Sequence, residues 1–376
     1  MKLIFILTRD QGRPGFLADQ PASGIKPTLL LSLSVEAITM KVDTFTIDTH
    51  SSGKPLKCAA KRYRPHGASS EGRPAPGHIL IFTHGTGFHK EHWEVPILRL
   101  FTHSKSGGTK VSEAWSIDWQ THGDSAALNE TVIEAPDFEF SEFDYAEACA
   151  NLYRTFLLEN IEKGLNKVVL LGHSAGAASA SLATMFCDHP LFEAFIFVEP
   201  TIWPAEMAGV DAPVYKYVKR GILTRRDHWP TKAEAKRYFE GRAPWSYWDS
   251  RIREIYVEYG LKPDPVRGGW TLKCTPKHEL APFANDQKAV DVLPELNKTI
   301  KVVPIHLIYG GRNDMFSRKK QDSLLGGGRK FASVTRIPDA GHLVVQEAPD
   351  EVADVLFGIL RKLDRAAGHF EVQAKL

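Results

Sequence analysis

A serine flanked by two glycines has the clearest chemical meaning in this sequence. Gly172 and Gly176 lie two residues before and two residues after Ser174, in the pattern Gly-x-Ser-x-Gly. Residues 166–171 are typical of a fully buried strand, and residues 175–187 form an Ala- and Ser-rich segment typical of a helix packed against a sheet. Larger side chains than glycine would collide with the strand and helix at such a sharp turn. We therefore predict that Ser174 is a nucleophile.

This strand–turn–helix pattern resembles the nucleophile elbow of the α/β-hydrolases, in which the serine, an acid and a histidine follow in that chain order. A serine hydroxyl is a poor nucleophile at neutral pH and needs a base within hydrogen-bond reach. Histidine suits this role because its pKa lies near neutrality. Of the 15 histidines, only His342 lies in the loop between the last predicted strand and the final predicted helix. We expect His342 to be the general base.

Two carboxylates could orient this imidazole and stabilise its charged form. Glu199 ends the predicted strand after the serine, where burying a carboxylate is costly unless it has a partner. Asp314 follows the next predicted strand, which is the commoner position of the acid in this fold. A salt bridge would also explain Glu199, and a turn or a helix cap would also explain Asp314. We take Glu199 as the acid and keep Asp314 as the alternative.

Acyl transfer also needs two backbone N–H donors that stabilise the oxyanion of the tetrahedral intermediate. We expect one donor to be the amide of Ala175, which directly follows the serine. The other is expected to be the amide of Thr86, in a glycine-containing loop at 84–88. Three histidines near this loop match no metal-ligand spacing. The sequence therefore predicts neither a metal nor a cofactor.

The elements that must position these residues alternate between strands and helix-length segments. Strands are expected at 41–48, 56–63, 78–82, 111–117, 166–171, 191–198, 305–309 and 333–337. Amphipathic helices are expected at 142–163 and, closing the chain, at 347–363. This alternation predicts an α/β-hydrolase fold: a mostly parallel eight-stranded sheet with helices on both faces.

The alternation also defines the expected domains. Residues 40–200 and 303–370 should form the hydrolase core, and residues 201–302, where the alternation stops, should form a helical lid inserted after the sixth strand. Residues 1–39 lack a sustained hydrophobic period and are expected to lie outside the fold. Within the lid, residues 216–237 carry eight Lys and Arg against two Asp and Glu. This basic segment is expected either to hold the phosphates of a coenzyme A leaving group or to be a solvated helix face.

Composition narrows the class of protein further. With 376 residues, a net charge of +2, 43% hydrophobic and 24% charged residues, the chain is typical of a globular protein and gives no reason to expect a nucleic-acid partner. No apolar run approaches the ~18 residues of a transmembrane segment. Four scattered cysteines suit a reducing compartment. The terminal Ala374, Lys375 and Leu376 are a near variant of the Ser-Lys-Leu address, so we expect the peroxisomal matrix, with its import receptor as a partner.

Several further motifs are shared with a narrower group of proteins. They are Thr83–Gly87, Lys90-Glu91, Trp115–Asp118, Gly172–Ser174, Leu191-Phe192, Glu199-Pro200, His228–Pro230, Thr275–Glu279 and Gly341-His342. With these motifs the chain, from about Met40 onward, resembles fungal peroxisomal hydrolases of secondary metabolism. This group includes the acyl-CoA hydrolase of mycophenolic acid biosynthesis and hydrolases of host-selective toxin clusters. In this group the acid follows the sixth strand, which implies Glu199.

The site and the resemblance together imply a serine hydrolase that cleaves an ester or a thioester. The expected substrate is a small-molecule acyl compound, such as the coenzyme A thioester of a lipophilic fungal metabolite. The alternatives are a peroxisomal lipase or carboxylesterase, a cyclase or lyase that uses the same residues, and a binding protein without catalysis.

Overall fold

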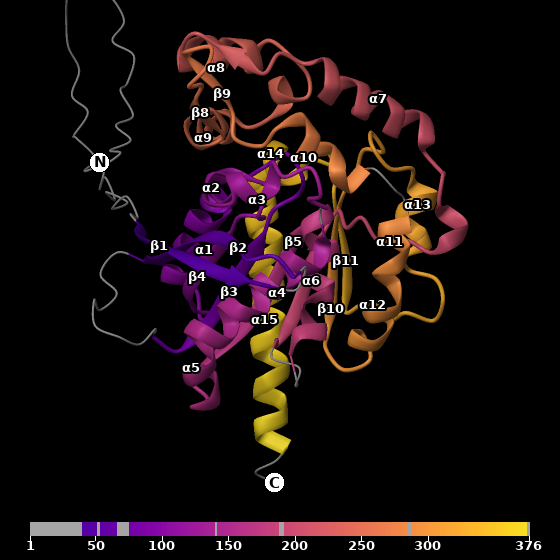
Figure 1. Cartoon of the computed structure of the whole chain (residues 1–376). Coiled ribbons are helices and arrows are strands. Elements are labelled where there is room, and N and C mark those ends of the chain that lie inside the picture. Colours follow the sequence, from indigo (N-terminus) through magenta and orange to yellow (C-terminus); the bar gives the residue numbers. More distant parts are fainter. Residues whose placement is uncertain are drawn as a thin grey trace, which may run out of the picture. The chain divides into compact units, whose positions relative to one another are not determined.

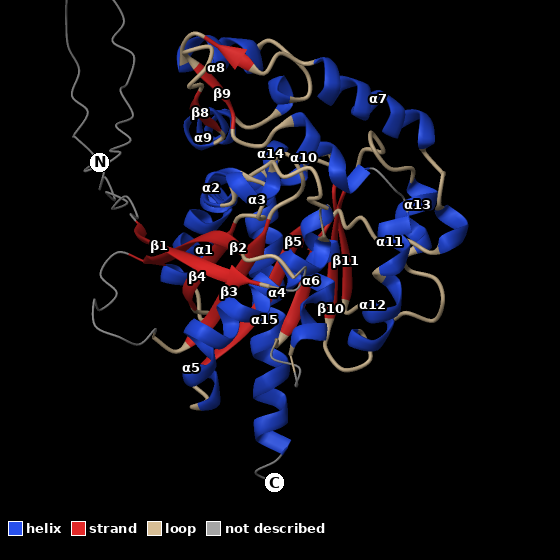
Figure 2. Ribbon diagram, viewed as in Figure 1, coloured by secondary structure: helices blue, strands red, loops and turns tan. Residues whose placement is uncertain are grey.

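The computed structural model describes residues 40–50, 53–65, 75–139, 141–187, 192–283 and 287–373. The predicted extension at 1–39 and the predicted targeting residues Ala374, Lys375 and Leu376 lie outside this described part. Figures 1 and 2 show the path of the chain and its secondary structure.

The central sheet has eight strands in the order β1-β2-β4-β3-β5-β6-β10-β11. Their bounds are Met40–Thr49 for β1, Leu56–Pro65 for β2, Gly77–Thr83 for β3, Val111–Ile117 for β4, Asn166–His173 for β5, Ala194–Val198 for β6, Ile305–Gly310 for β10 and Ser333–Ile337 for β11. The β1–β2 and β2–β4 pairs are antiparallel, and all the other pairs are parallel. This sheet is the mostly parallel, eight-stranded sheet that the sequence predicts.

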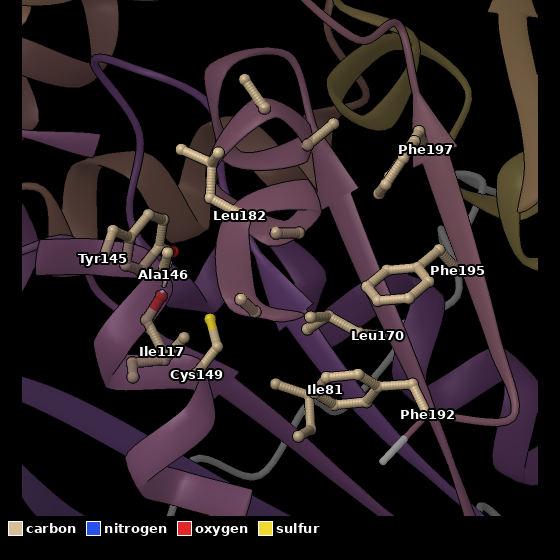
Figure 3. Packing of buried hydrophobic residues seen from close by; sticks show 14 of the residues in the cluster. Ile81, Ile117, Tyr145, Ala146, Cys149, Leu170, Leu182, Phe192, Phe195 and Phe197 are labelled. Atoms are coloured by element: carbon tan, nitrogen blue, oxygen red, sulfur yellow. Dashed lines mark hydrogen bonds between the residues drawn. The ribbon is translucent and has the colours of Figure 1, made fainter. Parts of the chain in front are cut away.

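Two hydrophobic layers cover the sheet, and β5 shows how its strands supply both. Val168 and Leu170 belong to the layer that includes α4 (Glu142–Leu152) and α6 (Ala175–Leu182). Val169 and Leu171 belong to the opposite layer, which includes α1 (Glu94–Ser106) and α15 (Pro349–Gln373). Because side chains alternate along a strand, both faces must be apolar when helices cover both. Figure 3 shows the first of these layers packed around Leu170.

Some expected helices are divided in the structure. The predicted helix 142–163 consists of α4, a π-helical stretch at Tyr153–Leu157 and α5 (Leu158–Glu162), and the wider turn keeps both Tyr153 and Leu157 in the core. The closing helix α15 begins at Pro349, after a separate short helix α14 (Val344–Glu347). The remaining helices of the core are α2 (Gly123–Leu128), α3 (Glu130–Ile133) and α13 (Arg318–Ser323).

An inserted segment lies between β6 and β10, in the region predicted to be a lid. Its helices are α7 (Ala212–Thr224), α8 (Lys232–Glu240), α9 (Ser250–Tyr259), α10 (Pro276–Leu280), α11 (Gln287–Asp291) and α12 (Leu293–Thr299). It also contains a small antiparallel sheet that the sequence analysis did not predict, formed by β7 (His228–Trp229), β9 (Trp270–Leu272) and β8 (Leu261–Pro263). Strands of two or three residues are too short to show a period in the sequence.

The inserted segment has an aromatic core of its own. Trp229, Phe239, Trp245, Trp248 and Tyr256 are all buried in one cluster. Among the described helices of the chain, none is both long enough and apolar enough to cross a membrane.

Candidate active site

The sharp turn after β5 places Ser174 at the start of α6 in a strained backbone conformation. Its φ of 55° and ψ of −123° lie in a region that non-glycine residues rarely occupy. The two flanking glycines are required by space. A Cβ atom at Gly172 would lie 2.5 Å from the Cα atom of Ala177, and one at Gly176 would lie 2.4 Å from the carbonyl oxygen of His84.

The structure brings Ser174, His342 and Glu199 together. The Nε2 atom of His342 lies 3.0 Å from the Ser174 hydroxyl oxygen, and its Nδ1 atom lies 3.1 Å from Oε2 of Glu199. All three residues are at most 5% exposed. An Nδ1–H bond to the carboxylate leaves Nε2 free to accept the hydrogen bond of the serine hydroxyl. This arrangement is suited to deprotonating the serine during attack.

Glu199 is held in place by groups from the neighbouring strand β10 and from α13. Its Oε1 atom accepts hydrogen bonds from the backbone N–H of Gly310 at 2.6 Å and from the side-chain amide of Gln321 at 3.1 Å. Its φ of 48° is left-handed, which is unfavourable for a glutamate. The buried carboxylate therefore has the partners that its burial requires.

Asp314, the alternative acid, contacts the backbone beside the imidazole. Its Oδ1 atom accepts a hydrogen bond from the N–H of His342 at 2.9 Å, and its carboxylate is paired with Arg312. The carboxylate fills the space next to Gly341 so closely that a Cβ atom there would lie 1.7 Å from its Oδ2 atom. The geometry therefore favours Glu199 as the partner of the imidazole and makes Asp314 a support of the loop that carries it.

Two further residues that the sequence analysis did not single out hold the same loop. His173 donates an Nε2–H hydrogen bond to the carbonyl oxygen of His342 at 2.9 Å. Burial, followed by the neighbouring His342, lowers the pKa of His173 to about 3, so His173 stays neutral. Glu347 accepts hydrogen bonds from the N–H of Gly341 at 2.8 Å and from Arg312 at 2.7 Å. No pattern in the sequence indicates that the side chains of His173 and Glu347 point toward this loop.

The two predicted oxyanion donors, Thr86 and Ala175, lie next to the same small cavity as Ser174. Both residues line this cavity, which has a volume of about 40 Å³. The amide of the next residue, Gly87, is already engaged, because it donates to Nε2 of His122 at 2.9 Å.

Neutral histidines fix the loop that carries Thr86. His84 donates from Nδ1 to the carbonyl oxygen of Gly85 at 2.8 Å, and its Nε2 atom accepts from the N–H of Trp119 at 3.1 Å. Burial lowers the pKa of His84 to about 4 and lowers that of His122 well below its ordinary value. Each imidazole can therefore accept a backbone N–H bond, which a charged imidazole could not.

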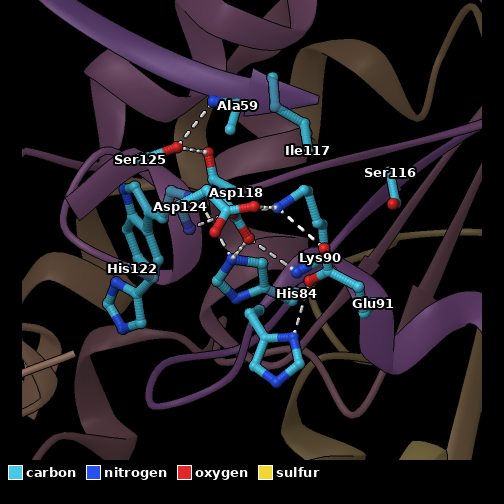
Figure 4. Close-up of polar contacts among 12 residues, drawn as sticks. Ala59, His84, Lys90, Glu91, Ser116, Ile117, Asp118, His122, Asp124 and Ser125 are labelled. Carbon is cyan, nitrogen blue, oxygen red and sulfur yellow. Dashed lines mark hydrogen bonds and ion pairs between the residues drawn. The ribbon is translucent and has the colours of Figure 1, made fainter. Parts of the chain in front are cut away.

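A largely buried ion cluster lies next to His84 of this loop, and Figure 4 shows its contacts around Lys90 and Asp118. The Lys90 ammonium lies within 3 Å of carboxylate oxygens of Asp118, Asp124 and Glu91. Lys61 adds a second cation, 3.0 Å from Glu91. Each of these charges has a partner of opposite sign, which offsets part of the large cost of removing it from water.

The three histidines in or near the loop are His84, His89 and His92, and each has its own partners. His84 bonds two backbone groups. His89 donates to Glu91, and His92 accepts from the side-chain amide of Gln346. In the described residues, no group of three or more His, Cys, Asp or Glu side chains is arranged to hold a metal ion.

Ser174 and His342 open onto a cavity of about 920 Å³ under the inserted segment, which we call the chamber. Eight of its lining residues are aromatic: Phe88, Tyr217, Tyr238, Trp245, Tyr247, Trp248, Tyr256 and Phe283. Three arginines also line it. Arg225 is paired with Glu279 and Arg312 with Glu347, whereas Arg242 lies 4.3 Å over the ring of Tyr238.

Comparison with known families identifies the class of protein. Residues 80–355 match the model of the alpha/beta hydrolase family, and the chain belongs to this family. This result confirms the family and the fold that the sequence predicts.

Two fungal proteins are among its curated relatives. The chain is 24% identical over 293 residues to the peroxisomal membrane protein LPX1 of Saccharomyces cerevisiae, with 73% of each chain covered. It is 22% identical over 225 residues to the abhydrolase domain-containing protein AFT2-1 of Alternaria alternata, with 52% of this chain and 83% of the relative covered. Both matches agree with the predicted resemblance to fungal hydrolases.

Solved structures show the same fold. The peroxisomal α/β-hydrolase Lpx1 of Saccharomyces cerevisiae superimposes with a TM-score of 0.65 at 20% identity, covering 90% of this chain and 99% of that one. E-2-(acetamidomethylene)succinate hydrolase superimposes with a TM-score of 0.60 at 15% identity, covering 84% and 98% respectively.

The contacts of Glu199 and Asp314 lead to different expectations for two matched variants. Glu199→Gln removes the charge that stabilises the imidazolium, so we expect kcat to fall about ten-thousandfold. Asp314→Asn keeps an oxygen acceptor for the N–H of His342, so the loss should stay below about tenfold. Steady-state kinetics on one activated ester would measure both. A larger loss for Asp314→Asn than for Glu199→Gln would identify Asp314 as the acid.

The neutral state of His173 predicts a pH dependence of stability. Its pKa is about 3 in the folded chain against an ordinary 6.5, so between these values only the unfolded chain binds the proton. The free energy of unfolding is therefore unaffected by protonation of His173 above pH 6.5. Below pH 6.5 it falls by about 1.4 kcal/mol for each pH unit, because protonation favours the unfolded chain. His173→Gln can donate the same hydrogen bond without titrating. When the free energy of unfolding is measured with urea at several pH values between 7 and 5, it should fall less with pH in this variant than in the wild type. An equal fall in the two proteins would contradict a neutral His173.

Proposed function

We propose that this protein is a serine hydrolase that cleaves esters or thioesters of bulky lipophilic acyl groups. One observation carries the proposal: the buried hydrogen-bonded series from Ser174 through His342 to Glu199 opens onto the aromatic chamber. A thioesterase domain and an esterase with solved structures share the fold, but the proposal depends on this geometry.

In the proposed reaction, the oxygen of Ser174 attacks the substrate carbonyl while Nε2 of His342 takes the serine proton. The amides of Thr86 and Ala175 bind the oxyanion, and the Glu199 carboxylate stabilises the imidazolium without taking its proton. His342 then donates the proton to the departing alkoxide or thiolate, which leaves an acyl-serine. Water attacks this ester, with His342 as its base, and releases the carboxylic acid and the free serine.

The chamber supports the choice of substrate class. Its volume of about 920 Å³ is at the upper end for small-molecule sites, and its aromatic lining suits a large apolar acyl group. Arg242 has no carboxylate partner among the described residues, although the chamber's other two arginines do. An unpaired guanidinium at this position suits a phosphate of coenzyme A.

The resemblance to fungal hydrolases of secondary metabolism supports an acyl-CoA from such a pathway as the substrate. We further propose that the protein acts in the peroxisome. This is the compartment named for Lpx1, and the predicted address at Ala374–Leu376 points to it too.

Replacement of the nucleophile tests the proposed chemistry. Ser174→Ala should lose turnover and labelling by a fluorophosphonate probe, because no activated hydroxyl remains. Ser179→Ala is a matched control, since Ser179 is a fully buried serine of α6 whose hydroxyl has no hydrogen-bond partner in the described part. Ser179→Ala should keep both turnover and labelling.

Screening acyl-CoA, p-nitrophenyl ester and lipid panels with product analysis separates a thioesterase from a lipase, a carboxylesterase or a lyase. Labelling of Ser174→Ala as strong as wild type would refute the proposal.

Arg242 tests the proposed leaving group. Loss of a charge-assisted hydrogen bond in Arg242→Ala should raise KM for an acyl-CoA about tenfold, with little change for the p-nitrophenyl ester of the same acyl group. Arg237→Ala removes an exposed cation of α8 that does not line the chamber and should change neither value. Equal increases in KM for both substrates would show that Arg242 does not recognise coenzyme A.

A further inference from the structure

Helix α7 of the inserted segment presents two different faces. Val214, Val218 and Ile222 recur at intervals of four residues, and all three line the chamber. Lys216, Lys219, Arg220 and Leu223 follow the spacing i, i+3, i+4 and i+7, and none of these four lines the chamber. Because an α-helix repeats every 3.6 residues, these four side chains form one stripe opposite the chamber face. In Figure 1, α7 lies at the upper right of the drawn ribbon.

The positive charge of this stripe is not neutralised within the described part of the chain. Lys216, Lys219 and Arg220 have no ion pair with a described carboxylate, and Lys216 and Arg220 are exposed. Four of the other five cations of the basic segment at 216–237 are paired: Arg225 with Glu279, Arg226 with Glu234, Lys232 with Glu258 and Lys236 with Glu254. The fifth, Arg237, is exposed on α8. The free charge is therefore concentrated on α7.

Large apolar side chains are exposed beside these cations. Leu223 is the last residue of the stripe along the chain, and around the helix it points between Lys219 and Arg220. It is 65% exposed, and Tyr217, at the edge of the chamber face, is 79% exposed. Tyr247, which also lines the chamber, is 67% exposed. The cations supply the charge that anionic lipid headgroups attract, and the exposed leucine and tyrosine beside them supply side chains that can enter the membrane interface.

We propose that the outer stripe of α7, formed by Lys216, Lys219, Arg220 and Leu223, docks this protein on an anionic lipid bilayer. The stripe spreads over about two turns of one helix, outside the lining of the chamber, whereas a small phosphate ligand needs a concave site. The cations match the charge of the lipid headgroups, and Leu223 reaches toward the acyl chains. Docking there brings Tyr217 and the chamber close to the bilayer. Only the delivery of a lipophilic substrate, not the docking itself, rests on the proposed function.

Cosedimentation of the full chain with vesicles tests the docking. Vesicles of phosphatidylcholine with about one third phosphatidylserine should bind the protein at low salt, and binding should fall at 0.5 M NaCl because salt screens the attraction. The triple variant Lys216→Glu, Lys219→Glu, Arg220→Glu should bind at least about tenfold more weakly. Leu223→Ser should weaken binding at every salt concentration and keep its salt dependence.

The matched control carries the same change of charge on another helix. Arg361, Lys362 and Arg365 are exposed on α15, and their triple replacement by Glu should leave vesicle binding within about twofold of the wild type. Equal losses for the two triple variants would show a nonspecific effect of net charge and overturn the proposal. Failure of the wild type to bind, or displacement by millimolar coenzyme A, would overturn it too.

Activity in solution separates this proposal from the proposed function. The α7 triple variant should hydrolyse a short water-soluble p-nitrophenyl ester at the wild-type rate and keep the wild-type Tm. Loss of vesicle binding with this activity intact supports docking by α7. Vesicle binding by a wild type that hydrolyses no ester would contradict the proposed function and leave the docking supported.

Discussion

The site depends on one contact between residues 168 positions apart, the hydrogen bond between the imidazole of His342 and the hydroxyl of Ser174. The serine is fixed by the sheet, but the histidine lies in a loop, so the fold must hold that loop as firmly as a strand. It does so through the backbone of His342 itself. Asp314 accepts the N–H, and His173 donates to the carbonyl oxygen. Because His173 directly precedes Ser174, the same turn that strains the serine also holds the loop of His342.

The loop that carries Thr86 is held largely by polar and charged side chains. It rests on neutral imidazoles, and behind them Lys90 and Asp118 are paired in the interior. Asp118 also accepts the backbone N–H of Lys90 at 2.7 Å. A buried charge without a partner is strongly destabilising, so each member of this cluster requires the positions of the others. Such mutual dependence keeps a glycine-containing loop in a single conformation next to Ser174.

The sequence was sufficient for the sheet, because strands covered on both faces must be continuously apolar and the elbow requires glycines on both sides of the serine. It also placed Ser174 at the turn after β5 and His342 in the loop after the last strand, where the structure has them. It favoured Glu199 without excluding Asp314, since both follow neighbouring parallel strands and the difference lies in the direction of each side chain. The left-handed φ of Glu199 turns that carboxylate toward the imidazole. No periodicity encodes such a local bend, nor the outward hydrogen bond of His173.

The walls of the chamber differ in how firmly they are packed, and this difference has a consequence for entry. The aromatic cluster around Trp248 and Tyr256 extends to Phe88, the last residue of the loop that carries Thr86, and to Leu343, which follows His342. That wall is therefore part of the same packed unit as the loops that carry Thr86 and His342. Helix α7, in contrast, buries only Tyr215 and Ile222. Since opening free energy rises with buried contacts, α7 is the wall that can move with the least loss of packing. A large apolar substrate would then enter beside α7 while the wall next to Ser174 and His342 keeps its geometry.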